Sequence, residues 1–82
     1  MMKVEFLNGK QWKMAFISFS ENDKSRFAKM QRIMAEVGWQ IDADDSGLAG
    51  VCGVSDKNEF SRFMRDWCLV RRLTAKRREN GN

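Results

Sequence analysis

A cluster of arginines and lysines near the C-terminus is the feature of this sequence best suited to recognition chemistry. Residues 71–78 hold five cations and no acid, whereas the cations and acids of residues 1–70 balance. The guanidinium group of arginine binds phosphate and carboxylate oxygens in pairs, so the cluster favours a polyanionic partner. The candidate contacts to nucleic acid or to an acidic protein are Arg62, Arg65, Arg71, Arg72, Lys76, Arg77 and Arg78.

Most of these cations fall on one side of a predicted helix. At helical spacing, Arg62, Arg65 and Arg72 lie within about 80° of one another. Three interpretations remain open for this side: a phosphate-binding surface, a docking surface for an acidic protein, and a solvated face whose cations complement the negative end of the helix dipole. Leu69 and Leu73 interrupt the polar surface, which favours contact with a protein.

The aspartates of residues 42–47 follow the first half of a calcium-binding loop. Oxygen ligands stand at alternate positions and a glycine follows at the sixth. The last position of such a loop requires glutamate, but the sequence has Gly53 there. Because aspartate and glycine are also typical of tight turns, the segment predicts a hairpin turn and no metal site.

The two cysteines, Cys52 and Cys68, offer little for catalysis. The sequence has no histidine, so neither a zinc site nor a serine triad can be completed from its residues. A glycine-rich phosphate loop is also missing. Free cysteines usually behave as small buried apolar residues, and we expect both to be reduced and structural. The prediction is a protein without catalytic residues, cofactor, metal or small-molecule substrate.

Length and composition indicate one small folded domain. The chain has 82 residues, of which 43% are hydrophobic and 32% charged, as is ordinary for a globular protein. No segment resembles a signal peptide or a membrane span, and two cysteines cannot build the disulfide framework of a small secreted domain. We expect a single domain over residues 1–75, a basic, frayed tail over residues 76–82, a cytoplasmic location and no membrane contact.

Turn signals and apolar spacing predict two hairpins, each followed by a helix. Asn8-Gly9 between two apolar runs is typical of a type I′ hairpin turn. Apolar residues three and four positions apart predict helices after Ser20 and after Ser55, and Gly38 ends the first of them. The expected strands are residues 4–7, 10–19, 39–43 and 48–54.

Each predicted helix has one apolar stripe, so both helices must cover the same face of one sheet. The fold class is therefore α+β: a single two-layer sandwich in ββαββα order, with a four-stranded, mainly antiparallel sheet and two helices on one face. The stripe of the first helix is Phe27, Met30, Ile33, Met34 and Val37. The expected core between the layers is Phe27, Met30, Met34, Phe60, Phe63 and Trp67.

One face of the sheet stays uncovered in such a sandwich. The second strand is apolar on both faces, so it can turn either its Ile17 side or its Phe16 side to solvent. Exposed apolar residues on a sheet can stack nucleobases, join two copies into a homodimer or bind the edge of a partner. The candidate contacts to a partner protein or a second copy are Leu69, Leu73, Ile17 and Phe19.

Together these features predict a small, non-enzymatic binding or regulatory protein. The leading hypothesis is contact with nucleic acid through the second helix and the basic tail. The alternative is a protein-binding inhibitor or adaptor of the kind that phages and mobile elements encode, such as an anti-defence protein, acting through the second helix or the exposed sheet face. Salt separates the two, because phosphate contacts weaken steeply as the salt concentration rises.

Overall fold

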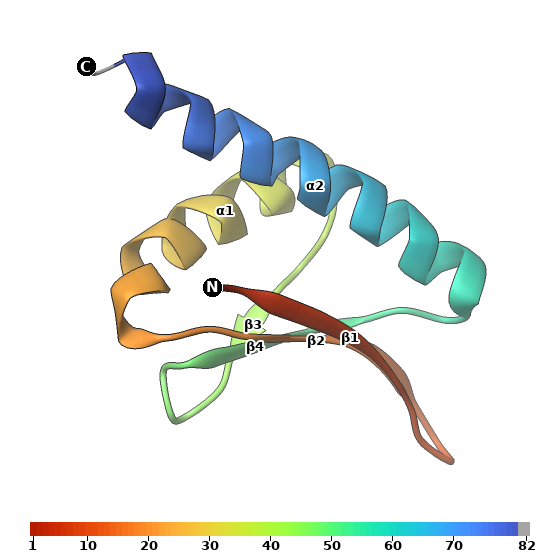
Figure 1. The fold of residues 1–82 in the computed structure, drawn as a ribbon. Coiled ribbons are helices and arrows are strands. Elements are labelled where there is room, and N and C mark those ends of the chain that lie inside the picture. Colours follow the sequence, from red (N-terminus) through yellow and green to blue (C-terminus); the bar gives the residue numbers. More distant parts are fainter. Residues whose placement is uncertain (81–82) are drawn as a thin grey trace.

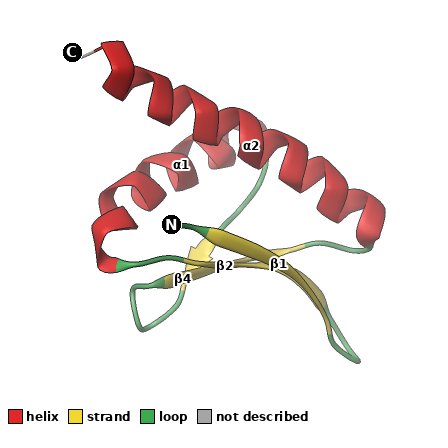
Figure 2. Cartoon of the chain, viewed as in Figure 1, coloured by secondary structure: helices red, strands yellow, loops and turns green. Residues whose placement is uncertain are grey.

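The chain forms two hairpins, each followed by a helix (Figures 1 and 2). The computed structural model describes residues 1–80, with side chains described through Ala75. The elements are β1 (Lys3–Asn8), β2 (Lys13–Ser18), the 3-10 helix η1 (Glu21–Asp23), α1 (Lys24–Val37), β3 (Asp42–Ala43), β4 (Ala49–Gly53) and α2 (Lys57–Asn80). The frayed tail expected over residues 76–82 stays a prediction, because the side chains of residues 76–80 and the whole of residues 81–82 lie outside the described part.

The four strands form one antiparallel sheet in the order β1-β2-β4-β3. The second strand of each hairpin is an inner strand, and the two inner strands pair with Phe16 opposite Val51. Both helices lie on one face of the sheet (Figure 1). The predicted α+β class, the element order and the two-helix layer are therefore confirmed.

Aromatic rings dominate the core between the helices and the sheet. Phe63 and Trp67 of α2 are almost fully buried and stack with 5.8 Å between ring centroids. Trp67 also contacts Phe27 of α1, whose ring stacks on Phe19 at 4.3 Å. A continuous aromatic row therefore joins both helices to the end of β2. Of the predicted core residues, Phe60 is half-buried and those found buried are Phe27, Met30, Met34, Phe63 and Trp67.

The Ile17 side of β2 faces the helices. Ala15 and Ile17 are fully buried, and Phe19 is 8% exposed. The prediction that Ile17 and Phe19 contact a partner is therefore wrong, because both residues are part of the core. Side chains alternate between the two faces of a strand, so the same register turns Phe16 towards the uncovered face.

The first hairpin turn is not of the predicted type. Residues 9–12 join β1 to β2, and the Gly9 amide donates to the Trp12 carbonyl at 3.0 Å. Neither Asn8 nor Gly9 has a positive φ, which a type I′ turn requires at both central residues. The hairpin predicted here is present, but the longer turn moves Trp12 out of the second strand.

The third strand is shorter than the predicted range of residues 39–43. Gln31 of α1 donates from Nε2 to the Ile41 carbonyl at 2.6 Å, so this carbonyl bonds to a helix side chain. The residue before this segment is Gly38, whose φ of 112° ends α1 as predicted. The chain therefore stays against the helices after α1 and joins the sheet only at Asp42.

Gly50 on β4 allows α1 to approach the sheet closely. A Cβ atom at this position would lie 2.5 Å from Cζ of Phe27 and 3.1 Å from Cγ2 of Ile41. Real side chains do not tolerate the first of these distances, so either the Phe27 ring or the strand would have to move. The absence of a side chain at Gly50 thus sets the spacing between α1 and the sheet.

We expect Gly50→Ala to lower the free energy of unfolding by about 1–3 kcal/mol, because the added methyl group overlaps the Phe27 ring in a close-packed core. Urea unfolding followed by tryptophan fluorescence measures the change. Gly53→Ala is the matched control on the same strand, since a Cβ there meets no atom within 4 Å. Equal losses in the two variants would contradict the role assigned to Gly50.

Candidate interaction surface on the helix layer

Polar contacts lock α1 and α2 together near both ends of α1. Arg26 donates from Nε to Oγ1 of Thr74 at 3.2 Å and from Nη2 to the Arg71 carbonyl at 2.9 Å. At the other end, Trp39 donates from Nε1 to the Asp66 carboxylate at 2.8 Å. No local pattern in the sequence indicates these contacts, although a tryptophan N–H beside a core needs an acceptor. The two helices form one fixed layer as a result.

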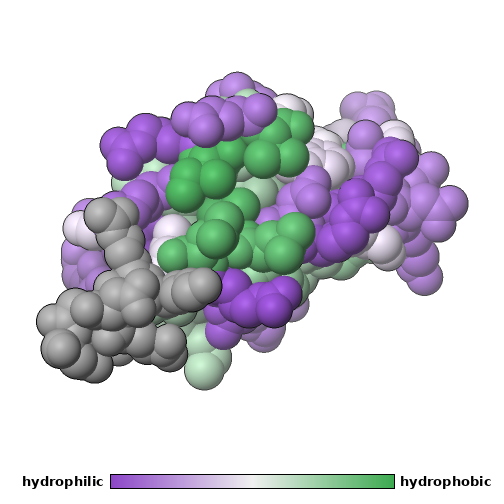
Figure 3. Space-filling view, turned by 90° about the horizontal axis from the view of Figure 1, so that it is seen from above, coloured by the Kyte–Doolittle hydropathy of each residue, from purple (hydrophilic) through white to green (hydrophobic). Residues whose placement is uncertain are grey.

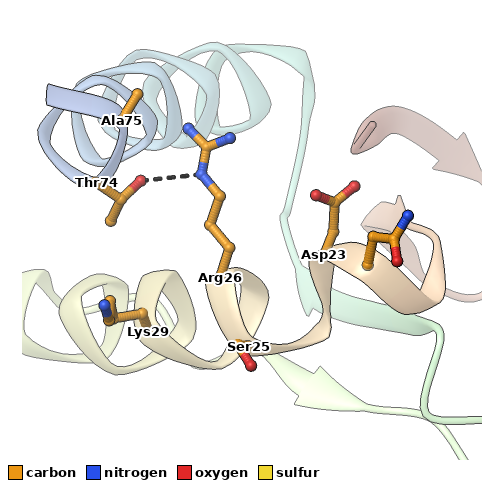
Figure 4. Close-up of a pocket in the computed structure, with 7 residues that line it drawn as sticks. Asp23, Ser25, Arg26, Lys29, Thr74 and Ala75 are labelled. Carbon is orange, nitrogen blue, oxygen red and sulfur yellow. Dashed lines mark hydrogen bonds between the residues drawn. The ribbon is translucent and has the colours of Figure 1, made fainter. Parts of the chain in front are cut away.

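A polar pocket of about 400 Å³ opens beside Arg26, between the start of α1 and α2 (Figure 4). Three of its polar side chains, those of Asp23, Arg26 and Thr74, already serve the fold. Arg26 reaches across the gap to Thr74, and Asp23 accepts a hydrogen bond from Ser20. The hydrogen bond from Arg26 to Thr74 joins the two helices across the pocket. Its lining residues are Asn22, Asp23, Ser25, Arg26, Lys29, Thr74 and Ala75.

A capping box fixes the start of α2. The Glu59 amide donates to Oδ1 of Asp56 at 2.9 Å, and Oε1 of Glu59 accepts from the Ser55 amide. These bonds satisfy backbone donors that a helix start leaves unpaired, and each carboxylate complements the positive end of the helix dipole.

Aliphatic side chains gather on the outer side of the helix layer (Figure 3). Leu69 is 49% exposed and Leu73 61%, one turn apart on α2. On α1, Val37 is 55% exposed and Ile33, one turn before it, is partly buried against the core. These four residues are called the helix-layer patch below. The prediction that Val37 belongs to the buried stripe is wrong, because that stripe is wider than the surface that the sheet and α2 cover.

Arginines from the predicted cationic stripe flank the patch on α2. Arg62 forms an ion pair with Glu59 at 3.8 Å, and Arg65 forms one with Asp66 at 3.7 Å. Both arginine side chains remain more than half exposed in these pairs. Such exposed pairs are each worth less than about 1 kcal/mol, so either arginine can exchange its partner for an incoming carboxylate or phosphate at little cost.

Arg71 and Arg72 are also exposed on α2. No ion pair joins either of them to a residue whose side chain the structure describes. Arg72 lies on the same side of the helix as Arg65. Both Arg71 and Arg72 line a shallow hollow that also contains Cys68 and Ala75. The remaining predicted contacts, Lys76, Arg77 and Arg78, have side chains outside the described residues.

The two cysteines occupy different environments. Cys52 is buried under the helices, and this burial raises the pKa of its thiol from 9.0 to about 11. Cys68 is exposed on α2, so its predicted place in the core is wrong. The reason is helical phase: Trp67 points into the core, and the next residue turns about 100° away from it.

The aspartate-rich segment after β3 forms the predicted turn. Oδ1 of Asp44 accepts from the Ser46 amide at 3.0 Å and from its hydroxyl at 2.6 Å, and Gly47 adopts a φ of 74°. The Asp44 carboxylate therefore stabilises the turn itself. Within the described residues, no three acidic or cysteine side chains are grouped so that they could hold a metal ion.

Comparison of the chain with protein-family models, curated proteins and solved structures found no match. Among the described helices, none combines the length and the apolar character needed to cross a membrane. The feature of the molecule that indicates a function is its surface: an aliphatic patch that spans two helices held together by polar contacts, with arginines beside it.

We expect Cys68 to react with a thiol reagent within minutes under native conditions, while Cys52 reacts only when the protein unfolds. Mass spectrometry of the labelled protein distinguishes the two, and Cys68→Ser should remove the fast reaction. The stabilisation gained by burying the neutral Cys52 thiol is complete below pH 9 and is lost as the pH rises towards 11, because only the unfolded chain ionises in that interval. Two fast thiols at neutral pH would contradict the placement of Cys52.

Proposed function

We propose that the protein is a non-enzymatic adaptor or inhibitor that binds an acidic protein through the helix layer. The observation that carries this proposal is the helix-layer patch. Three large aliphatic side chains about half exposed or more, Val37, Leu69 and Leu73, lie on two helices that polar contacts hold rigidly together. Grouped apolar side chains of this kind are typical of protein interfaces.

The energies favour a protein over a nucleic acid at the patch. Full burial of a leucine or valine side chain contributes about 1.5–3 kcal/mol of free energy. Because Val37, Leu69 and Leu73 are each about half exposed, a partner that covers them would gain roughly half of this amount from each residue. A phosphate backbone offers no apolar surface that would bury them. The neighbouring Arg62, Arg65 and Arg72 would then pair with carboxylates at the rim of the interface, where they steer association and select the partner.

An exposed free thiol at Cys68 supports a reducing compartment such as the cytoplasm, because exposed thiols oxidise in secreted proteins. The absence of histidine and the use of nearby carboxylates in caps and turns support a role in binding and not in catalysis. Inhibition or bridging by occupation of a partner surface requires no catalytic group.

Nucleic-acid binding is the second candidate, and the exposed pair Arg71 and Arg72 favours it. Together with Arg65 these residues extend along α2 towards the basic segment over residues 76–78, which is the arrangement expected of a helix that follows a phosphate backbone. This mode would use the cations and leave the aliphatic patch in solvent.

We expect Leu69→Glu/Leu73→Glu to abolish binding of the partner recovered with the wild-type protein from its host, because two carboxylates replace apolar contacts and oppose an acidic surface. The melting temperature should stay nearly unchanged, since both side chains are already about half exposed. Glu5→Lys on β1 is a control variant distant from the helix layer. A partner held equally by all three proteins would contradict the proposed surface.

Nuclease treatment and a salt series separate the two candidates. With the protein partner, recovery should survive nuclease digestion. Arg65→Glu/Arg72→Glu should then weaken binding roughly tenfold, mainly through slower association. With nucleic acid, the same variant should abolish binding, and each lost phosphate contact should flatten the logarithmic salt dependence by about one unit. Nuclease-sensitive recovery that the leucine variant leaves intact would favour the second candidate.

A further inference from the structure

The face of the sheet opposite the helices carries an uncovered apolar surface of its own. Residues paired directly across antiparallel strands share a face, and the register places Leu7 opposite Met14 and Phe16 opposite Val51. Leu7 is 42% exposed, and Trp12, in the turn at the end of this face, is 65% exposed. Both helices lie on the other side of the sheet (Figure 1). Phe16 and Val51 are half-buried on this face, and Met14 is only 8% exposed, so Leu7 and Trp12 are its most exposed apolar residues.

The turns at the two ends of this face carry opposite charges. The turn between β1 and β2 holds Lys10 and no acid, and the turn between β3 and β4 holds Asp44 and Asp45 and no cation. The pairing of β2 with β4 puts the two turns at opposite ends of the sheet. Both turns project to the side away from the helices, so they flank the open face (Figure 1).

The tip residues of both turns are available for a contact between molecules. Within the described part of the chain, neither Lys10 nor Asp45 belongs to an ion pair. Lys24 approaches Gly47 from the helix side of the acidic turn, but its own ion pair is with Glu21 at 3.4 Å. The Asp44 carboxylate is already held by Ser46, which leaves Asp45 as the acid at the tip.

We propose that two copies of this chain pack through their open sheet faces as a two-fold symmetric dimer. A two-fold axis that runs across the strands, in the plane between the sheets, brings the basic turn of each copy to the same end as the acidic turn of the other. An axis along the strands would instead bring like turns together, so the charges select the antiparallel arrangement. Leu7, Trp12 and Phe16 of each copy lie within the contact and supply its apolar area.

The charge balance of the two faces points to a second copy here and not on the helix layer. The sheet face carries both signs, including the Lys3–Glu5 pair at 3.9 Å, and so matches itself. The helix layer presents Arg62, Arg65 and Arg72, and a second copy would oppose the same cations. The dimer uses a different surface from the one in the proposed function and does not depend on it.

The experiment is sedimentation velocity on the full chain over roughly 1 µM to 1 mM, with a charge-swap series. We expect the mass to rise from one chain to two with concentration, and the Trp12 emission to shift to shorter wavelength with it. Lys10→Glu and Asp45→Lys should each raise the dissociation constant about tenfold, because each change turns two attractive contacts per dimer repulsive. The double variant should return to within about threefold of the wild type, since the swapped charges again meet opposite signs.

Leu73→Glu on the helix layer is the control and should dimerise like the wild type. A single-chain mass at every concentration would overturn the proposal. A dimer that is insensitive to Lys10→Glu and Asp45→Lys, or one that Leu73→Glu disrupts, would also overturn it, because either result places the contact on another surface. Failure of the partner-binding experiment leaves this outcome unaffected, because the dimer test changes Lys10 and Asp45, which the partner-binding variants leave in place.

Discussion

The row of aromatic rings from Phe19 through Phe27 and Trp67 to Phe63 sets the positions of the two helices on the sheet. Its first ring is that of Phe19, the residue directly after β2, and the others belong to the two helices, so the row fixes both helices relative to the sheet. Such a row fits only where α1 can approach β4 without a side chain between them, which Gly50 allows. The outer surfaces of the protein follow from this inner arrangement.

The fold class was predictable because it depends on pattern. Asn8-Gly9, Gly38 and the spacing of apolar residues mark the ends and types of the elements, and one apolar stripe per helix requires a two-layer sandwich. The exposed side of β2 was not predictable, because the strand is apolar on both faces and only the contacts across the sheet separate Ile17 from Phe16. A local pattern contains no information about which of two similar faces a distant helix will cover.

The candidate site likewise contains residues that a local pattern could predict and residues that only contacts between distant parts of the chain could reveal. Leu69 and Leu73 stood out in the sequence because they interrupt a charged helix side, and the structure leaves both exposed. Val37 did not stand out, since its spacing is that of a core residue. The contacts of Arg26 and Trp39 join residues far apart in the chain, and no local signal indicates which acceptor each donor will reach. Sequence thus located half of the patch, and three-dimensional packing was needed for the rest.

The sheet order also has a consequence for how the chain acquires its structure. Each hairpin pairs neighbouring segments, which form quickly because little chain entropy is lost when a short loop closes. The pairing of β2 with β4 must instead close a loop that contains all of α1, and it completes the surface on which both helices pack. This slower, non-local step is the point at which the two halves become one cooperative unit. A chain that has formed both hairpins but not this pairing exposes the edges of β2 and β4, and these edges are the places where misfolding and aggregation would begin.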